Sequence, residues 1–272
     1  MQQFSSSPLE MVGSFWRNRS LIKALSYRGV VGRYRGSVLG ILWSFFNPIF
    51  MLAVYTFVFS VVFNARWSAN AGSKVEFALV LFAGLLVFNL FAECVSQAPG
   101  LIIANTNYVK RVIFPLEILP VVSVCSALFH ALISLLVWLV FYVISIGLPH
   151  QTVLLLPFVL IPLLFITLGL SWLLASLGVF IRDVSQLVAI VVTVLMFLSP
   201  IFYPVTALPD KYRLILHLNP LCPAIEQMRE VLYWGRVPSL LMYGAYLASS
   251  LMVAWLGFAW FQKTRKGFAD VL

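Results

Sequence analysis

The most constraining feature of this chain is an abrupt change from basic to apolar sequence near residue 35. Six of the 18 lysines and arginines lie between Arg17 and Arg35, and no charged residue follows until Arg66. An apolar run of about 20 residues can cross the hydrocarbon core of a bilayer, and basic residues beside such a run mark its cytoplasmic end. The sequence therefore predicts an integral membrane protein whose N-terminus lies in the cytoplasm.

The composition agrees with a fold that lipid covers. The 272 residues are 62% hydrophobic and 10% charged, whereas soluble domains carry about 25% charged residues. The basic residues behind the net charge of +9 lie at the edges of apolar runs. This placement is typical of orientation signals and of contacts with anionic membrane lipid. We therefore expect no nucleic-acid partner. Cys94, Cys125 and Cys222 are odd in number and far apart, which predicts neither a disulfide framework nor a metal site.

We predict an all-α polytopic membrane protein with six transmembrane helices, an N-terminal amphipathic interfacial helix and two short re-entrant helices between the fifth and sixth crossings. Ser7, Pro8 and Glu10 form a helix start signal. An apolar and aromatic face followed by Arg17 and Arg19 suits the headgroup layer. The crossings are expected at residues 38–63, 77–104, 119–146, 153–181, 184–202 and 240–261.

The organisation expected is one membrane domain over residues 1–272. It consists of a cytoplasmic interfacial segment (1–37), crossings one to five (38–202), an outer re-entrant segment (203–239), crossing six (240–262) and a cytoplasmic tail (263–272). With the N-terminus inside, twelve of the 18 lysines and arginines fall in cytoplasmic segments and six fall outside. This asymmetry places both termini in the cytoplasm.

The outer segment carries two helix patterns, at residues 209–219 and 223–235. The second pattern ends at Gly235, where a glycine suits a helix C-cap. A segment of this length with amphipathic helices is typical of elements that dip into the membrane. The apolar Ile225, Met228 and Leu232 are expected on one face of the second helix, and the charged Glu226, Arg229 and Glu230 on the other.

The sequence does not predict an enzyme. It lacks the GxxxxGK[ST] loop that cradles ATP phosphates, so any ATP-driven activity needs a separate ATPase subunit. The acids near membrane depth, Glu93, Glu117 and Asp183, are far apart in sequence, and His130 stands alone in an apolar run. No general base with an orienting partner can be named. An ion-coupled secondary transporter would need inverted repeats and more titratable residues at membrane depth, and a membrane-embedded transferase would need an acid or histidine cluster.

The loop between the second and third predicted crossings carries a short helix pattern. Its residues 105–107 (Asn-Thr-Asn) are N-cap residues, the pattern continues to residue 112, and a Phe-Pro pair ends it. Lys110 and Arg111 lie on this helix. We interpret it as a rigid lever that receives force from a cytoplasmic partner, although a positively charged cytoplasmic turn explains the two charges equally well.

Four blocks of the sequence occur in an informative order along the chain. They are RYRGSVLGILW at residues 33–43 with the Asn-Pro pair that follows, KRVIFPLEILP at 110–120, FIRDVSQLV at 180–188 and LSPIFYP at 198–204. In this order and spacing they resemble the membrane subunits of ABC type-2 polysaccharide exporters. That family includes the exporters of O-antigen, capsular polysaccharide and teichoic acid, and the likeness covers nearly the whole chain.

The resemblance implies a homodimer that pairs with two copies of a cytoplasmic ATPase subunit. ATP and Mg would be bound by that partner, and no cofactor is expected on this chain, which would be a transporter subunit. The substrate would be lipid-linked polysaccharide, in the first place O-antigen, moved from the cytoplasm across the bacterial inner membrane. An ABC type-2 exporter of a drug or small lipid is the alternative. The coupling helix that docks on the ATPase would contain Asn105, Tyr108, Lys110 and Arg111.

The resemblance also implies that the first and fifth crossings line the channel. Aromatic rings suit the C–H faces of sugars without fixing one position, so a polymer can slide along them. Contact with lipid or ordinary helix packing is the alternative for each ring. The candidate glycan contacts are Trp43, Phe46, Phe50 and Phe57 in the first crossing and Phe197, Phe202 and Tyr203 at the end of the fifth.

Three arginines are candidates for binding the pyrophosphate of a lipid-linked substrate. Arg28, Arg33 and Arg35 lie at the predicted inner headgroup level, and a guanidinium group binds phosphate with a fixed fork geometry. Orientation of the chain and attraction to anionic lipid explain these charges as well.

Overall fold

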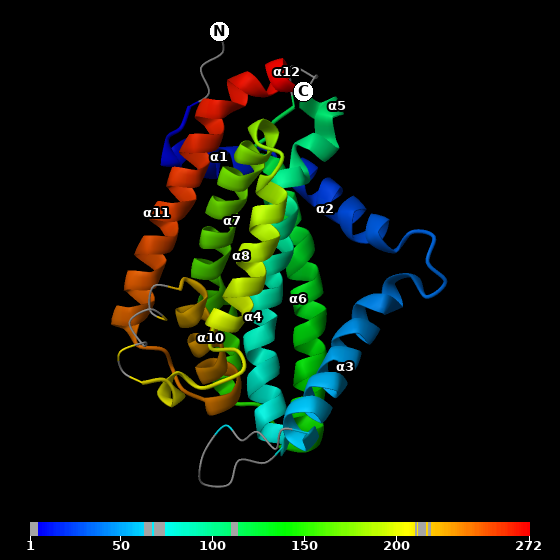
Figure 1. The fold of residues 1–272 in the computed structure, drawn as a ribbon, viewed down its shortest axis with the longest axis vertical. Helices are drawn as coiled ribbons and strands as arrows, with labels where there is room; N and C mark the ends of the chain where they lie inside the picture. The colour runs from blue at the N-terminus through cyan, green and yellow to red at the C-terminus, as the bar shows by residue number, and fades with distance from the viewer. Residues whose placement is uncertain are drawn as a thin grey trace.

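The computed structural model describes residues 5–62, 67, 74–109, 114–209, 211, 216 and 219–272. Over these residues the chain forms helices and connecting segments without a β-strand. Five helical stretches are long and apolar enough to cross a membrane, and they form one elongated bundle (Figure 1). The protein is an all-α polytopic membrane protein, as the sequence predicts.

The five spans match five of the predicted crossings within a few residues, except that the last continues to Val271, ten residues beyond the predicted end at Phe261. The first, Gly40–Phe59, combines η1 (Gly40–Leu42), α3 (Trp43–Tyr55) and the start of η2 (Thr56–Val62). Its predicted end at residue 63 lies outside the described residues. The other spans contain α4 (Lys74–Leu101), α6 (Ile118–Ser145), η4 (Gln151–Leu155) with α7 (Leu156–Phe180), and α11 (Leu240–Thr264) followed by η7 (Arg265–Gly267) and α12 (Phe268–Val271).

The predicted fifth crossing is shorter than expected. It corresponds to α8 (Val184–Leu198), which has 15 residues and ends four residues before the predicted boundary at Phe202. The helix stops because Ser199 precedes Pro200 and takes an extended conformation, with φ −85° and ψ 148°. At a rise of 1.5 Å per residue, α8 covers about 22 Å, less than the ~30 Å of the hydrocarbon core. A sixth full crossing therefore stays a prediction.

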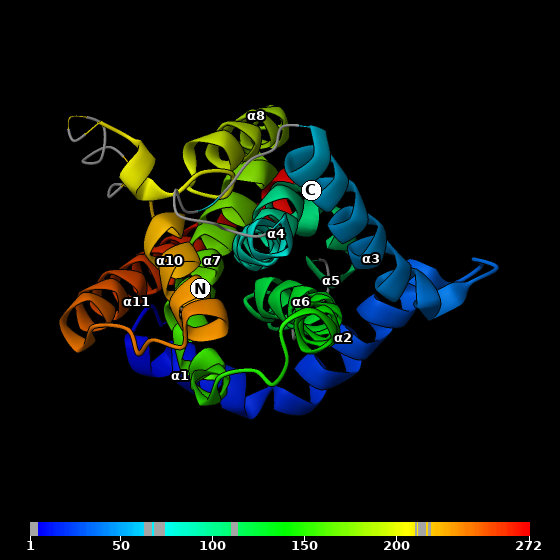
Figure 2. The same ribbon diagram turned by 90° about the horizontal axis from the view of Figure 1, so that it is seen from below.

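Helix α4 forms the centre of the bundle. It packs against α3, α6, α7, α8 and α10 (Leu221–Arg229), which surround it when the bundle is viewed along its length (Figure 2). The hydrophobic side chains between Phe77 and Phe91 are buried. A helix that is apolar all round is stable only when other helices or lipid cover every face, and here other helices do so.

Helices α7 and α11 approach each other closely because glycines face one another. A Cβ added to Gly257 would lie 2.0 Å from the carbonyl oxygen of Gly169, and one added to Gly169 would lie 2.5 Å from that of Val253. Small residues allow helices in a membrane to pack backbone against backbone. This contact fixes α11 to the bundle.

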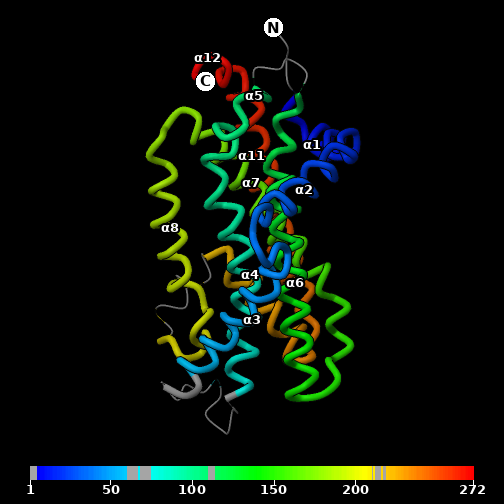
Figure 3. The backbone as a smooth tube through the Cα atoms, turned by 90° about the vertical axis from the view of Figure 1, so that its right-hand side faces the viewer, coloured from blue at the N-terminus to red at the C-terminus, as the bar shows by residue number. Residues whose placement is uncertain are grey.

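Helices α1 (Pro8–Arg17) and α2 (Arg19–Tyr34) lie at the same end of the bundle as α12, which we call the terminal end (Figures 1 and 3). The Ser7 hydroxyl accepts a hydrogen bond from the backbone N–H of Glu10 at 3.2 Å, which confirms the predicted N-cap. The Glu10 carboxylate pairs with Arg17. The two ends of the described chain thus lie on one side of the bundle, as the orientation prediction requires.

The segment after α8 lies at the opposite end. It contains η5 (Val205–Ala207), α10 and η6 (Glu230–Trp234), and Gly235 ends η6 with a left-handed φ of +62°, as predicted. Most of the predicted helix at 209–219 lies outside the described residues. Helix α10 packs against α4 and α7, and its predicted apolar residues, together with Leu232 of η6, are buried.

Arg229 corrects one expectation for this segment. The sequence analysis placed it on the charged face, opposite Ile225, but only 4% of its surface is exposed. Arg229 lies four residues after Ile225, which is one helical turn, so the two share a face. Its guanidinium group is buried among backbone carbonyls of α4 and of the turn after α8.

Candidate functional site

Three ionisable side chains, one each from α2, α4 and α6, meet in the bundle. Arg33 Nη2 of α2 lies 2.7 Å from Glu93 Oε1 of α4, and His130 Nδ1 of α6 lies 3.1 Å from the same oxygen. Arg33 Nη1 lies 2.9 Å from His130 Nδ1, so the tautomer of the imidazole decides whether Nδ1 donates to Glu93 or accepts from Arg33. We call these three residues the Arg33 cluster.

Two polar stripes on otherwise apolar helices position the cluster. Asn89, Glu93 and Gln97 follow one another at intervals of four residues on α4. Residues spaced by three and four lie on the same face of a helix. Ser123, Ser126, His130 and Ser134 do the same on α6. All seven line cavities beside the cluster, so the facing stripes create a polar groove between α4 and α6.

The first cavity has a volume of about 360 Å³ and extends from the Arg33 cluster toward the terminal end. Its walls come from α2, α4 and α6, and from η3 (Ile103–Asn105) with α5 (Thr106–Val109). We call it the α5 cavity. Its charged and polar lining comprises Arg28, Arg33, Glu93, Gln97, Asn105, Tyr108, Ser123, Ser126 and His130.

The second cavity has a volume of about 550 Å³ and lies on the other side of the cluster, against α3. We call it the α3 cavity. Arg33, Glu93 and His130 line it as they line the α5 cavity, so the cluster stands where the two meet. The rest of its lining combines aromatic and amide side chains, including Trp43, Tyr55, Asn47 and Asn89.

The three arginines predicted to bind phosphate occupy different positions. Arg28 is exposed and lines the α5 cavity. Arg33 lines both cavities but is already paired with Glu93. Arg35 is exposed just beyond the end of α2 and lines neither cavity. Two of the three therefore share one cavity, and one of those two has an internal counter-ion.

The predicted coupling helix is short in the described residues. The Asn105 amide donates to the Leu101 carbonyl, and the Thr106 hydroxyl donates to the Ile103 carbonyl. These bonds satisfy a carbonyl at the C-terminal end of α4 and one in η3. Tyr108 stacks on Phe114, with ring centroids 4.2 Å apart. Lys110 and Arg111 lie outside the described residues.

The predicted glycan contacts lie on or directly after two helices, α3 and α8, which flank α4 on different sides (Figure 2). On α3 and η2, Trp43, Phe46, Phe50 and Phe57 are between 39% and 60% exposed, and Trp43 also lines the α3 cavity. On α8, Phe197 is 61% exposed. Phe202 is half-buried and stacks on Phe59 at 5.4 Å, and the Tyr203 hydroxyl donates to the Phe197 carbonyl.

Sequence reasoning missed the pairing of Glu93 with His130. It treated both as isolated residues, and the structure joins them across two helices. The four-residue spacing of polar side chains on each helix was a usable signal, but the sequence does not state which faces meet. Within the described residues, no group of three His, Cys, Asp or Glu could hold a metal ion. The arrangement suits the binding of an anion beside arginine.

The family model described as ABC-2 type transporter matches residues 20–233 of this chain. The chain belongs to the ABC-2 type transporter family. The match includes the Arg33 cluster, both cavities and most of the segment after α8.

Individual ABC-2 proteins are similar over almost the full length. The chain is 30% identical to the O-antigen export system permease protein RfbA of Myxococcus xanthus, over 96% of this chain and 99% of that protein. It is 26% identical to a Klebsiella pneumoniae protein of the same name, over 93% and 95% of the two chains. The polysialic acid transport protein KpsM of Escherichia coli is 22% identical, over 88% of this chain and 91% of that protein.

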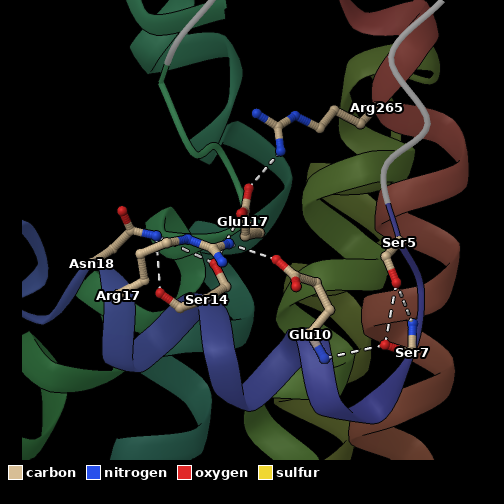
Figure 4. A network of polar contacts seen from close by, with 8 residues as sticks. All are labelled: Ser5, Ser7, Glu10, Ser14, Arg17, Asn18, Glu117 and Arg265. Carbon is tan, nitrogen blue, oxygen red and sulfur yellow. Dashed lines mark hydrogen bonds and ion pairs between the residues drawn. The ribbon is translucent and has the colours of Figure 1, made fainter.

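A second polar network ties the terminal end of this ABC-2 chain together (Figure 4). Glu117, just before α6, accepts hydrogen bonds from Ser14 of α1 at 2.9 Å and from Arg265 of η7 at 2.5 Å. Arg265 also donates to the Phe114 carbonyl, and Trp172 of α7 donates to the Glu117 carbonyl. The side chains of Glu117 and Arg265 are 6% and 10% exposed. Asp183, the other acid that the sequence analysis considered, is exposed before α8.

Proposed function

We propose that this chain is the channel-forming permease subunit of an ATP-driven exporter of lipid-linked polysaccharide, specifically O-antigen. Its similarity to a named O-antigen export permease over 99% of that protein supports this polymer class, and the polysialic acid transport relative supports it further. In this proposal two copies form the channel in the bacterial inner membrane, with their termini in the cytoplasm. Two copies of a separate ATPase subunit bind ATP and Mg and drive transport.

The observation that carries the proposal is the α5 cavity. It brings Arg28 and Arg33, the candidate phosphate-binding residues, into one space with Asn105 and Tyr108 of the candidate coupling helix. A lipid-linked glycan presents a phosphate group at headgroup depth, and arginine binds phosphate strongly. Movement of the coupling helix would therefore reshape the cavity in which the head of the substrate is held.

The alternative within the ABC-2 family, an exporter of a drug or small lipid, has less support. Sites for drug-sized ligands are mainly apolar and occupy about 300–1,000 Å³. In the described part of the chain, the apolar cavity that α4, α6, α7 and α10 line has a volume of only about 20 Å³, whereas the α5 cavity and the α3 cavity both contain the Arg33 cluster. Charged walls favour a substrate with an anionic head.

Deletion of the gene for this chain tests the proposal. We expect surface polysaccharide to disappear and lipid-linked polysaccharide to accumulate on the cytoplasmic side, because synthesis continues without export. Both changes should be reversed by the wild-type gene, with immunoblots of surface glycan and mass spectrometry of extracted lipid-linked glycan as measurements. Unchanged surface glycan together with increased sensitivity to lipophilic drugs would refute the proposal and favour the alternative.

Replacing Trp43, Phe46, Phe50 and Tyr203 together by leucine tests the aromatic path. If each ring contributes the ~0.5–1.5 kcal/mol typical of aromatic contacts, their combined loss slows export by roughly tenfold or more. The measurement is the rate at which labelled glycan reaches the cell surface, with copurification of the ATPase subunit as the assembly check.

The matched control for this variant replaces Phe158 and Trp260 by leucine. These two rings are 60% and 45% exposed on α7 and α11, away from the α3 cavity. Equal export by the control, the aromatic variant and the wild type would refute the proposed glycan contacts.

A further inference from the structure

The Arg33 cluster forms a partition between two cavities. Among the described residues, the three members of the cluster are the side chains that line both the α5 cavity and the α3 cavity. A head group moving from one cavity to the other has to pass them. Among the described residues that line these two cavities, Glu93 is the one carboxylate, so it is the internal anion that would compete for Arg33.

The partition also fastens the α2–α3 elbow to the bundle. Arg33 lies one residue before the end of α2, and the connection to α3 contains Gly36 and Gly40 with left-handed φ values of +87° and +52°. Glycine adopts such conformations without a steric cost, which suits a connection that bends. Figure 1 shows α2 and α3 diverging from the bundle to either side of this bend. The Arg33–Glu93 pair is a direct tie between the bend and α4.

The strength of this tie suits exchange. The side chains of Arg33 and Glu93 are 42% and 20% exposed, so the pair is partly open to the cavities and is easier to exchange than a fully buried ion pair. A phosphate group offers the same fork geometry as a carboxylate and carries more negative charge. An arriving phosphate can therefore compete with Glu93 for the guanidinium group of Arg33.

We propose that Glu93 is a displaceable counter-ion, which keeps Arg33 latched between the two cavities until the anionic phosphate head of the lipid substrate replaces it. His130 then keeps its hydrogen bond to the released carboxylate of Glu93. Exchange frees the α2–α3 elbow and joins the two cavities into one path toward the aromatic and amide side chains of the α3 cavity. This inference rests on the proposed function and adds the residue that controls access.

The test measures binding of fluorescent undecaprenyl pyrophosphate to the full chain purified in detergent, by anisotropy. We expect Glu93→Gln to tighten binding about fivefold, because it removes the competing anion, and Arg33→Gln to weaken it about tenfold. The double variant should match Arg33→Gln alone, since Glu93 acts only through Arg33. Glu93→Asp, which keeps the charge on a shorter side chain, should fall between the wild type and Glu93→Gln.

Glu10→Gln is the matched control. It makes the same change of charge in the exposed Glu10–Arg17 pair, outside both cavities, and should bind the probe like the wild type. Inorganic pyrophosphate should displace the probe, whereas undecaprenol, which lacks phosphate, should not. The latch is refuted if Glu93→Gln and Glu93→Asp bind no more tightly than the wild type, if the double variant still binds more tightly than Arg33→Gln, or if only undecaprenol competes.

The outcome separates the latch from the proposed function. If deletion of the gene abolishes surface glycan but Glu93 has no effect on probe binding, the export proposal stands and the latch is wrong. If Glu93 controls probe binding but deletion leaves export intact, the cluster recognises a phosphate lipid and the polysaccharide proposal is wrong. The melting temperature of each variant shows whether a loss of binding reflects unfolding.

Discussion

Replacing Arg229 with methionine should lower the thermal midpoint of the purified protein by about 6–12 °C. The guanidinium group donates from Nε to the Val80 carbonyl at 3.0 Å, from Nη1 to that of Pro200 at 2.5 Å and from Nη2 to that of Ile201 at 2.8 Å. Methionine fills a similar volume but donates nothing, so these buried carbonyls lose partners at about 1 kcal/mol each. Each kcal/mol lowers the midpoint by about 2–4 °C in a chain of roughly this size.

The position of Arg229 explains why this loss should affect a whole segment. Pro200 and Ile201 follow the C-terminal end of α8, where carbonyls lack helical partners. Gly84 leaves the space for the guanidinium, because a Cβ there would lie 2.9 Å from Arg229 Nη2. One side chain of α10 therefore joins the end of α8 to α4.

The control for Arg229→Met is Arg236→Met, since Arg236 is exposed seven residues later. We expect Arg229→Met to increase cleavage of residues 203–239 by added protease, whereas Arg236→Met should behave like the wild type. Equal midpoints and equal cleavage of the two variants would show that the three hydrogen bonds contribute no net stability.

Much of the fold could be predicted from hydropathy, because each membrane-spanning helix is defined by its own residues. The ends of α6, α7 and α11 follow the predicted boundaries within a few residues, since lipid requires a continuous apolar run of sufficient length. Helix α8 is the exception. The Ser-Pro pair after Leu198 stops it, although apolar sequence continues to Phe202.

The candidate site could be predicted only in part, because it depends on which helix faces meet. The arginines and the coupling helix were visible as charges beside apolar runs. Glu93 and His130 are 37 residues apart, and their contact depends on the rotation of α4 against α6. Arg229 shows the same limitation in reverse: its charge favoured an exposed position, whereas carbonyls from distant segments satisfy it inside the protein. Periodicity gives the face of a helix but not its partner.

Replacing Glu117 with alanine should reduce export at least tenfold and destabilise the terminal end by about 3–5 kcal/mol. This is the usual consequence of leaving one partner of a buried ion pair without the other, here Arg265. Glu117 follows the candidate coupling helix closely in the sequence and contacts α1 and η7 through its side chain. A push on the coupling helix would therefore reach α1 and α11 through this network.

A double variant separates stability from coupling. Well-packed apolar residues can replace a buried ion pair with little loss of stability, so Glu117→Leu with Arg265→Met should melt closer to the wild type than Glu117→Ala does. Export should stay low in both variants, because both lack the hydrogen bond from Ser14 to Glu117. The double variant also lacks the bond from Arg265 to the Phe114 carbonyl. Thermal unfolding and the appearance of labelled glycan at the cell surface are the two measurements.

The matched control is the Glu10–Arg17 pair, which lies near Glu117 (Figure 4). Glu10→Gln breaks the exposed Glu10–Arg17 pair on α1 and should change neither stability nor export, because water screens exposed ion pairs. Recovery of export together with stability in the double variant would contradict the coupling role and reduce the Glu117–Arg265 pair to a structural contact. If stability recovers and export does not, the result supports the proposal that force from an ATPase subunit passes through hydrogen bonds that apolar packing does not replace.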